Sequence, residues 1–270
     1  KDALRILNHY AHSKFLAVEA ESAWLSALEE MPINKKTQNA YQDYFLAYPK
    51  SSKGKLQYND FETQLEKELI KQADPAYQAW QKGVVALENG KYSKANQHFK
   101  IALAGRPKDP EVLSSLGLLN LRQGDNAVAY RYFKKAEQLS EDVNRISVLK
   151  GLANTAKFWQ YINLAELAIA ANNLSRAKLQ LDLAQTLDED PQTVLFYRAQ
   201  LAEKAGQAQQ AMVYYQQILT QDPLQARTLE AMLTLTTSDN NFSRSHQFYS
   251  QLTAKQQALI TEQYTRIKSR

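Results

Sequence analysis

The stretch ENGKYSKANQHFKIALAGRPKDPE, residues 88–111, places small, large and rigid residues in a fixed order. Within it, an Ala follows the first Gly after five positions, a Phe after four more, and a second Ala after three more. The next stretch, RQGDNAVAYRYFKKAEQLSED at residues 122–142, repeats this order at the same spacing. The two stretches together indicate an internal repeat, which decides how the rest of the sequence is interpreted.

The repeat has a period of 34 residues. The recurring pairs are Gly83 and Gly117, Gly90 and Gly124, Ala95 and Ala129, Phe99 and Phe133, and Ala102 and Ala136. A fixed period of this length is typical of stacked helical hairpins, each of which contacts only its neighbours. Good helix formers are abundant and alternating strand patterns are nearly absent. We therefore expect an all-α, right-handed solenoid of helix hairpins.

Four Asp-Pro pairs mark the expected starts of helices. Asp caps a helix by accepting a hydrogen bond from a free N–H of the first turn, and Pro fits the first helical position. Between these pairs, short breaks with Gly or Asn predict the left-handed turn inside each hairpin. The predicted helix starts are near residues 75, 110, 191 and 223, and the predicted turns are at 89–91, 123–125, 172–175 and 205–207.

These signals divide the chain into five segments. Residues 1–74 are expected to form degenerate N-terminal helical repeats, 75–140 two regular repeats, and 158–225 two more. Residues 226–270 are expected to form a degenerate repeat and a terminal helix, which a Thr-x-x-Gln capping box opens. The remaining segment, 141–157, is an insertion.

The insertion shifts the repeat by 14 residues, because the Ala expected at position 163 is found at Ala177. The inserted residues are predicted to be helical. We expect them to lack a second helix to pack on, and Gly151 weakens a helix interior by roughly 1 kcal/mol relative to Ala. The sequence therefore predicts a hinge at Gly151.

Composition and charge exclude several classes of function. The chain has no Cys, which excludes disulfides and thiolate metal sites. Its net charge of +5 is spread over interleaved acidic and basic residues, so it lacks the basic stripe of a nucleic-acid interface. No run reaches the roughly 18 apolar residues that span a bilayer, so membrane insertion is not expected. The first residue is Lys, which suggests a piece of a longer protein whose signal peptide would lie upstream.

Catalytic and metal-binding residues are sparse. His9 and His12 lie one helical turn apart, but no third ligand follows nearby. The acidic run DED at residues 188–190 comes directly before a Pro, so we interpret it as a helix end and cap rather than a pair of catalytic carboxylates. The sequence predicts a protein that is not an enzyme and that needs no cofactor or metal.

The repeat residues resemble the tetratricopeptide repeat. That family has small residues, an aromatic residue and a Pro at set positions, which residues 76–109 match with Gly83, Gly90, Ala95, Phe99, Ala102 and Pro107. The resemblance implies that the small residues allow close helix approach while the Phe fills the wedge between helices. The carboxylate clamp of chaperone-binding members is missing, since its positions hold Trp80, Gln81, Val84, Ser114, Ser115 and Leu118.

The first helix of each such repeat lines the concave groove of the solenoid. By that mapping, five aromatic residues are candidates for groove binding. They are Tyr77, Trp80, Trp159, Phe196 and Tyr197. Aromatic rings offer flat apolar area to a sugar or a peptide, but aromatic residues at helical spacing also fill gaps between repeats. Exposure of the rings would favour the binding role, and burial would count against it.

A narrower resemblance extends over roughly residues 20–270. The stretches WLSALEEMPINKKTQNAYQDYFLAYPK, ADPAYQAWQKG, RPKDPEVLSSLGLLNLRQGD and QLTAKQQALITEQYTRI are similar, in order and spacing, to the cellulose synthase operon protein C family of bacteria. That family implies a periplasmic repeat scaffold that joins the inner-membrane synthase to an outer-membrane barrel, with other proteins of the complex as partners. Two alternatives remain: a guide that touches the exported β-glucan chain, and a peptide-binding adaptor in another secretion assembly.

Overall fold

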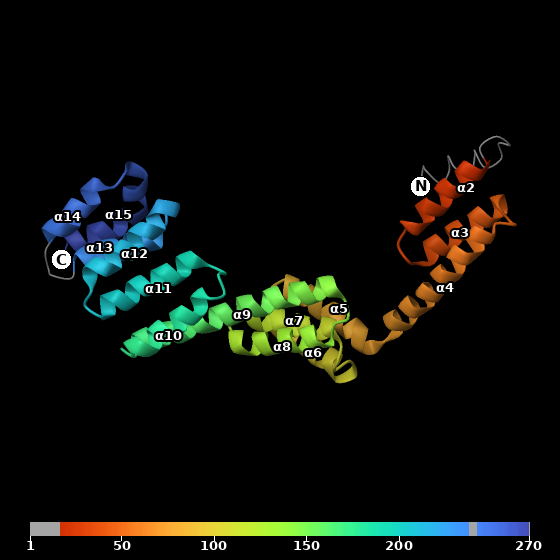
Figure 1. Ribbon diagram of the computed structural model, residues 1–270, viewed down its shortest axis with the longest axis horizontal. Helices are drawn as coiled ribbons and strands as arrows, with labels where there is room; N and C mark the ends of the chain where they lie inside the picture. Colours follow the sequence, from red (N-terminus) through yellow and green to blue (C-terminus); the bar gives the residue numbers. More distant parts are fainter. Residues whose placement is uncertain (1–16, 238–241, 270) are drawn as a thin grey trace. The chain divides into compact units, whose positions relative to one another are not determined.

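The computed structural model describes residues 17–237 and 242–269, and within these ranges the regular elements are all helices (Figure 1). This confirms the predicted all-α solenoid of helix hairpins. Residues 1–16, with His9 and His12, lie outside the described part. The helices are α2 (Ala17–Glu29), α3 (Lys35–Ala47), α4 (Ser52–Ala73), α5 (Pro75–Glu88), α6 (Tyr92–Gly105), α7 (Pro110–Arg122), α8 (Asn126–Leu139), α9 (Val143–Ala170), α10 (Leu174–Gln185), α11 (Pro191–Lys204), α12 (Ala208–Gln221), α13 (Ala226–Thr236), α14 (Phe242–Gln251) and α15 (Ala254–Lys268).

The chain forms two compact units, residues 1–107 and 108–270. The division falls between the two regular repeats, α5–α6 and α7–α8. In each of these repeats the two helices pack as an antiparallel hairpin, which is the expected repeating element.

Three of the four Asp-Pro pairs start helices as predicted. Asp74, Asp109 and Asp190 are the N-caps of α5, α7 and α11, and each is followed by Pro at the first helical position. The Asp74 and Asp109 carboxylates each accept a hydrogen bond of 2.8 Å from the backbone N–H two residues on. The Asp190 carboxylate accepts from the Thr193 N–H at 3.1 Å.

The fourth predicted start, at residue 223, is wrong. Asp222 is the C-cap of α12, and its carboxylate accepts from the Leu224 N–H at 3.2 Å, which closes a turn around Pro223. The next helix, α13, begins at Ala226. The same dipeptide therefore ends one helix here instead of starting another, because the Asp side chain bonds within the turn.

The wedge between the helices of each regular hairpin is filled by a Phe that meets a Gly. Phe99 and Phe133 are fully buried. A Cβ atom placed on Gly83 would lie 2.5 Å from the Phe99 ring, and one on Gly117 would lie 2.6 Å from the Phe133 ring. Only a residue without a side chain fits at these contacts, which explains the Gly at this point of the repeat. Four Ala residues that complete the hairpin contacts are buried with 0% exposure: Ala95, Ala102, Ala129 and Ala136.

The turns inside the hairpins also follow the prediction. Gly90, Gly124 and Gly206 have φ angles of 68°, 81° and 73°. Asn172 takes the same place in the third hairpin, with φ 56°. Asn is among the few other residues that adopt this left-handed conformation readily, so the turn is kept without Gly.

The inserted segment belongs to one continuous helix, α9, of 28 residues. Contrary to expectation, its added turns do not lack packing partners. Leu149, Ala153 and Ala156 are buried, and α9 packs on α8 as well as on α10. Near its start, Arg145 forms an ion pair with Glu111 of α7 at 2.5 Å. Gly151 lies on the exposed side of α9, where an added Cβ would meet open space, and a hinge at this residue stays a prediction.

The N-terminal helices α2, α3 and α4 share an aromatic core that no repeat pattern predicts. Trp24, Tyr41 and Tyr44 are almost fully buried there. Tyr44 donates a hydrogen bond to Glu21 at 2.9 Å, and burial raises the pKa of its hydroxyl to about 12. Gly54 of α4 allows the close approach, since a Cβ there would lie 2.3 Å from the Tyr44 ring.

Candidate functional site

The predicted groove residue Tyr77, on α5, is buried. The Lys71 ammonium lies 4.7 Å from the centre of its ring, and the Arg106 guanidinium lies 5.5 Å from it. Arg106 is also paired with Asp74 at 3.2 Å. Trp80, one turn along the same helix, is half-buried, with its ring centre 5.3 Å from that of Tyr77. The structure thus brings these two rings together, but Lys71 and Arg106 lie over the Tyr77 ring and leave little of it open to a ligand.

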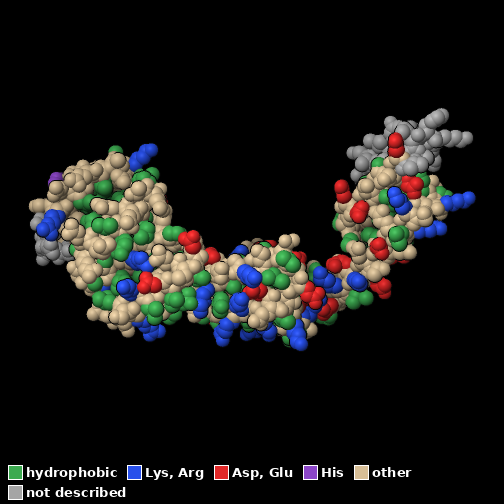
Figure 2. Space-filling view, in the orientation of Figure 1, with side chains coloured by type: hydrophobic (Ala, Val, Ile, Leu, Met, Phe, Trp, Pro, Cys, Tyr) green, Lys and Arg blue, Asp and Glu red, His purple; other side chains and the backbone are tan. Residues whose placement is uncertain are grey.

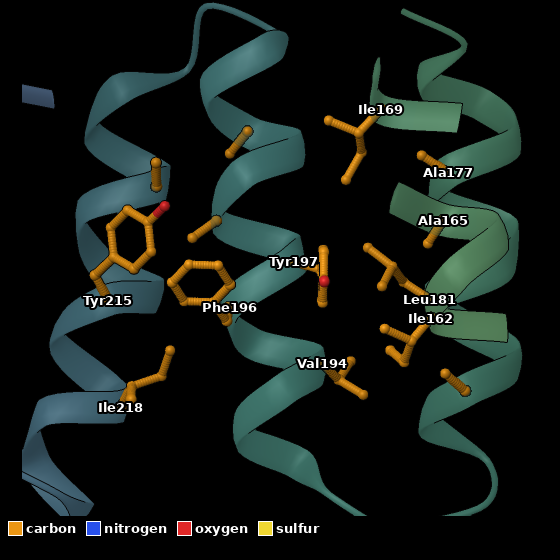
Figure 3. Packing of buried hydrophobic residues seen from close by; sticks show 14 of the residues in the cluster. Ile162, Ala165, Ile169, Ala177, Leu181, Val194, Phe196, Tyr197, Tyr215 and Ile218 are labelled. Carbon is orange, nitrogen blue, oxygen red and sulfur yellow. The ribbon is translucent and has the colours of Figure 1, made fainter. Parts of the chain in front are cut away.

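Phe196 and Tyr197, on α11, are buried as well. Figure 3 shows Phe196 pointing toward Tyr215 of α12 and Tyr197 pointing toward the helices that carry Ile162 and Leu181. The Arg227 guanidinium of α13 lies 3.9 Å from the centre of the Phe196 ring. These rings fill the space between neighbouring repeats, so they offer little area to a ligand.

Trp159 is the member of the predicted set with substantial exposure, 37%. Its ring meets buried Phe158 edge to face at 5.3 Å. It also lines a shallow hollow of about 310 Å³ with Leu121, Asn126 and Asn163. Burial of Tyr77, Phe196 and Tyr197 counts against the hypothesis that the five aromatic residues form one continuous glycan-binding row. Trp159 is still a candidate for contact with a glycan.

A cleft of about 440 Å³ lies between α10, α11 and α12. Its floor is apolar, with Leu181 and Ala202, while its rim carries Lys178, Asp182 and Arg198. Arg198 donates to the Asp182 carboxylate at 2.8 Å, so part of the rim charge is neutralised within the protein. No sequence pattern indicates this cleft, because it depends on the spacing between helices of adjacent repeats.

A half-buried carboxylate, Glu203, joins α11 to α12 close to this cleft. The Tyr215 hydroxyl donates a hydrogen bond of 2.5 Å to it. Burial raises the pKa of the Glu203 carboxyl above its ordinary value, and the Tyr215 hydrogen bond opposes part of this rise. Burial and the neighbouring carboxylate also raise the pKa of the Tyr215 hydroxyl. Because the hydrogen bond ties together the two helices of one hairpin, we assign the pair a structural role.

The raised pKa of Glu203 predicts a pH-dependent stability. A carboxyl with a higher pKa in the folded state stabilises folding below its unfolded pKa, and this contribution is lost as pH rises through the folded pKa. Glu203→Gln keeps an acceptor for Tyr215 without a charge to desolvate, so we expect it to be more stable than the wild type at neutral pH and to lose that advantage in acid.

Tyr215→Phe leaves the Glu203 acceptor unpaired and should lower the free energy of unfolding by about 1–3 kcal/mol. Urea denaturation at several pH values measures both, and an equal pH dependence for wild type and Glu203→Gln would contradict the assignment.

The acidic run at residues 188–190 has structural roles in the turn between α10 and α11. Asp190 caps α11, and Glu189 accepts a hydrogen bond from the Thr155 hydroxyl at 2.7 Å. Asp188 occupies the left-handed region with φ 51°, which closes the turn after α10. In the ranges 17–237 and 242–269, no three His, Asp or Glu side chains gather in a way that would hold a metal ion.

A further aromatic cluster lies outside the set predicted from the sequence. Phe242, His246 and Tyr249 follow one face of α14, and Tyr264 of α15 joins them. The spacing of four and three residues between aromatic side chains from 242 to 249 indicates a shared helix face. The repeat signals are weak in this part of the chain, so a mapping based on the repeat does not reach these residues.

Comparisons with known proteins agree with this architecture. A tetratricopeptide-repeat family model matches residues 81–143. Cellulose synthase operon protein C of Escherichia coli K12 is 25% identical over 187 residues, which cover 69% of this chain and 16% of the relative. Cellulose synthase 1 operon protein C of Komagataeibacter xylinus is 26% identical over 242 residues, covering 87% of this chain and 17% of the relative. The chain therefore spans about one sixth of these relatives.

Among solved structures, MamA from Desulfovibrio magneticus RS-1 aligns with 69% of this chain and 97% of its own. The TM-score is 0.43 at 13% identity, values that carry no conclusion about function. Residues 81–143 match the tetratricopeptide repeat, and a larger part of the chain is similar in sequence to cellulose synthase operon protein C.

Proposed function

We propose that this chain is a non-enzymatic scaffold segment of bacterial cellulose synthesis and export. In this role it lies in the periplasm and belongs to a longer protein that links the inner-membrane synthase to an outer-membrane barrel. The observation that carries the proposal is the similarity to cellulose synthase operon protein C over 69–87% of the chain. This similarity extends well beyond residues 81–143, the part that matches the general repeat family.

The arrangement of side chains supports a binding role. The strongest acidic motif, residues 188–190, is used for capping and for a cross-helix hydrogen bond. In contrast, large apolar side chains are exposed on the helices of the repeats, with exposures between 56% and 66%. They are Val85, Ile101, Val148, Leu167 and Leu179. A solenoid grows along one axis and offers long surfaces of this kind to protein partners.

The charge distribution fits protein partners better than nucleic acid. Figure 2 shows Lys and Arg side chains interspersed with Asp and Glu on the visible face. Within the described ranges, no helix combines the length and low polarity needed to cross a bilayer. The proposed partners are therefore the other proteins of the cellulose-synthesis complex, with the β-glucan chain as a second candidate that the aromatic cluster on α14 and α15 favours.

Deleting this segment in frame from the parent gene tests the proposal. We expect cellulose in the medium to fall to background, while isolated inner membranes keep their cellulose-forming activity, because a scaffold is needed for export and not for the chemistry. Restoring the unchanged segment at the same position serves as the control and should restore export. Normal export after the deletion, or loss of synthesis in the isolated membranes, would count against the scaffold role.

A further inference from the structure

Three aromatic rings lie beside one another at the C-terminal end of the described chain. The ring centres of Phe242, His246 and Tyr264 are 5.9–6.2 Å apart in all three pairs, and their planes lie within 28° of parallel. A face-to-face pair in the same cluster, Tyr249 and Tyr264, has centres only 3.9 Å apart. The planes of the three rings are therefore close to parallel and their centres are about equally spaced, and we call this group the aromatic layer.

Hydrogen bonds and stacking hold His246 and Tyr264 of the aromatic layer in place. The Nδ1 atom of His246 lies 2.6 Å from the Tyr264 hydroxyl, a hydrogen bond that fixes both rings. Tyr249 stacks on Tyr264 at an interplanar angle of 7°, and its own hydroxyl is 3.0 Å from the Thr261 hydroxyl. A surface that is ordered before binding loses little conformational entropy when a ligand arrives.

Packing of the hydrophobic core does not account for the whole layer. Tyr249 and Tyr264 rest against a small core of Leu229, Leu233 and Ile260. Phe242 and His246 lie beyond that core; Phe242 is 39% exposed and His246 is exposed. The layer thus extends aromatic area from the core into solvent.

The surroundings of the layer are mostly neutral hydrogen-bonding groups. Figure 2 shows few charged side chains over α12–α15 on the visible face. The charged residues of these two helices are Arg244 on α14, Lys255 and Lys268 on α15, and the α15 pair Arg266 and Glu262, which are 2.5 Å apart. Amide and hydroxyl side chains, which both donate and accept hydrogen bonds, are frequent on α14 and α15. They include Gln247, Gln251, Thr261 and Thr265, whereas Gln257 and Gln263 donate to the Tyr249 and Glu230 carbonyls within the protein.

We propose that the aromatic layer binds the flat face of a β-linked glucan chain. Glucose units in β-1,4 linkage carry their hydroxyls around the ring edge and present C–H groups on both faces, so the sugar face suits an aromatic ring and the edge suits neutral amides and hydroxyls. The identity of the sugar rests on the proposed role in cellulose synthesis; the layer itself does not depend on it.

The test is titration of the 270-residue chain with cellohexaose, with maltohexaose as the comparison sugar. We expect millimolar binding that moves the NMR signals of the His246 imidazole and leaves the three Trp indole signals unchanged. Phe242→Ala should weaken the binding about threefold to tenfold, and His246→Ala should weaken it further. Leu259→Ala is the matched control, since Leu259 is a 43% exposed apolar residue of α15 outside the layer, and it should bind like the wild type.

Several outcomes would overturn the proposal. One is the absence of binding at about 10 mM cellohexaose, a concentration at which even weak sugar contacts are detected. Another is binding that survives both Phe242→Ala and His246→Ala. Equal binding of maltohexaose, or NMR shifts confined to Trp159, would also contradict it. Protection of Phe242 by a protein partner instead of the sugar would also overturn it. Any of these results leaves the scaffold role intact if deletion of the segment still abolishes export, so the two proposals fail separately.

Discussion

Replacing Gly117 with Ala is expected to lower the free energy of unfolding by about 1–3 kcal/mol. The added methyl group would start 2.6 Å from the buried Phe133 ring, far inside van der Waals contact. Because Phe133 has 0% exposure, its ring is enclosed by other residues and cannot move away from the methyl group without displacing them. Urea denaturation followed by circular dichroism measures the change.

A second Gly in the same unit provides the control. Gly151→Ala should stabilise the protein by up to about 1 kcal/mol, since the new Cβ meets open space and Ala is the better helix former. Combining Gly117→Ala with Phe133→Leu should recover part of the loss, because the smaller side chain gives the methyl group room. Similar effects for Gly117→Ala and Gly151→Ala would show that the hairpin wedge is not formed by this contact.

Ala129→Leu should cost about 1–3 kcal/mol, because the larger side chain overpacks a hairpin contact in which Ala129 is fully buried. Ala127→Leu lies in the same helix but is exposed, so it should be nearly neutral. In the preceding repeat, Ala95→Leu and Ala104→Leu form an equivalent buried and exposed pair. If the buried and exposed members of each pair had equal effects on urea denaturation, the assigned repeat register would be incorrect.

The regular repeats could be predicted because their signals are local. A capping Asp, a Pro at the first helical position and a Gly at positive φ act within a few residues of one another. The contact between Gly83 and Phe99 joins two helices of one hairpin, so its partners also recur at a fixed spacing. Where the same dipeptide served a different local role, as at Pro223, the prediction was wrong.

The surface could not be predicted in the same way. The mapping of Tyr77 and Phe196 to the groove considered only their own helix, whereas Lys71, Arg106 and Arg227 reach over their rings from elsewhere in the chain. The N-terminal aromatic core around Tyr44 and the aromatic layer around His246 depend on packing between helices without a repeated pattern. Contacts of this kind follow from the tertiary structure, and one sequence alone does not place them.

The scaffold role is tested most directly by site-specific photo-crosslinking in cells that make the parent protein and its complex. A benzophenone amino acid would replace, one at a time, the exposed residues Val85, Leu167 and Leu179, with the same variants kept in the dark as the negative control. The scaffold account predicts adducts at one or more exposed positions that mass spectrometry identifies as other proteins of the cellulose-synthesis complex. Export of normal amounts of cellulose together with no such adduct at any exposed position would contradict it.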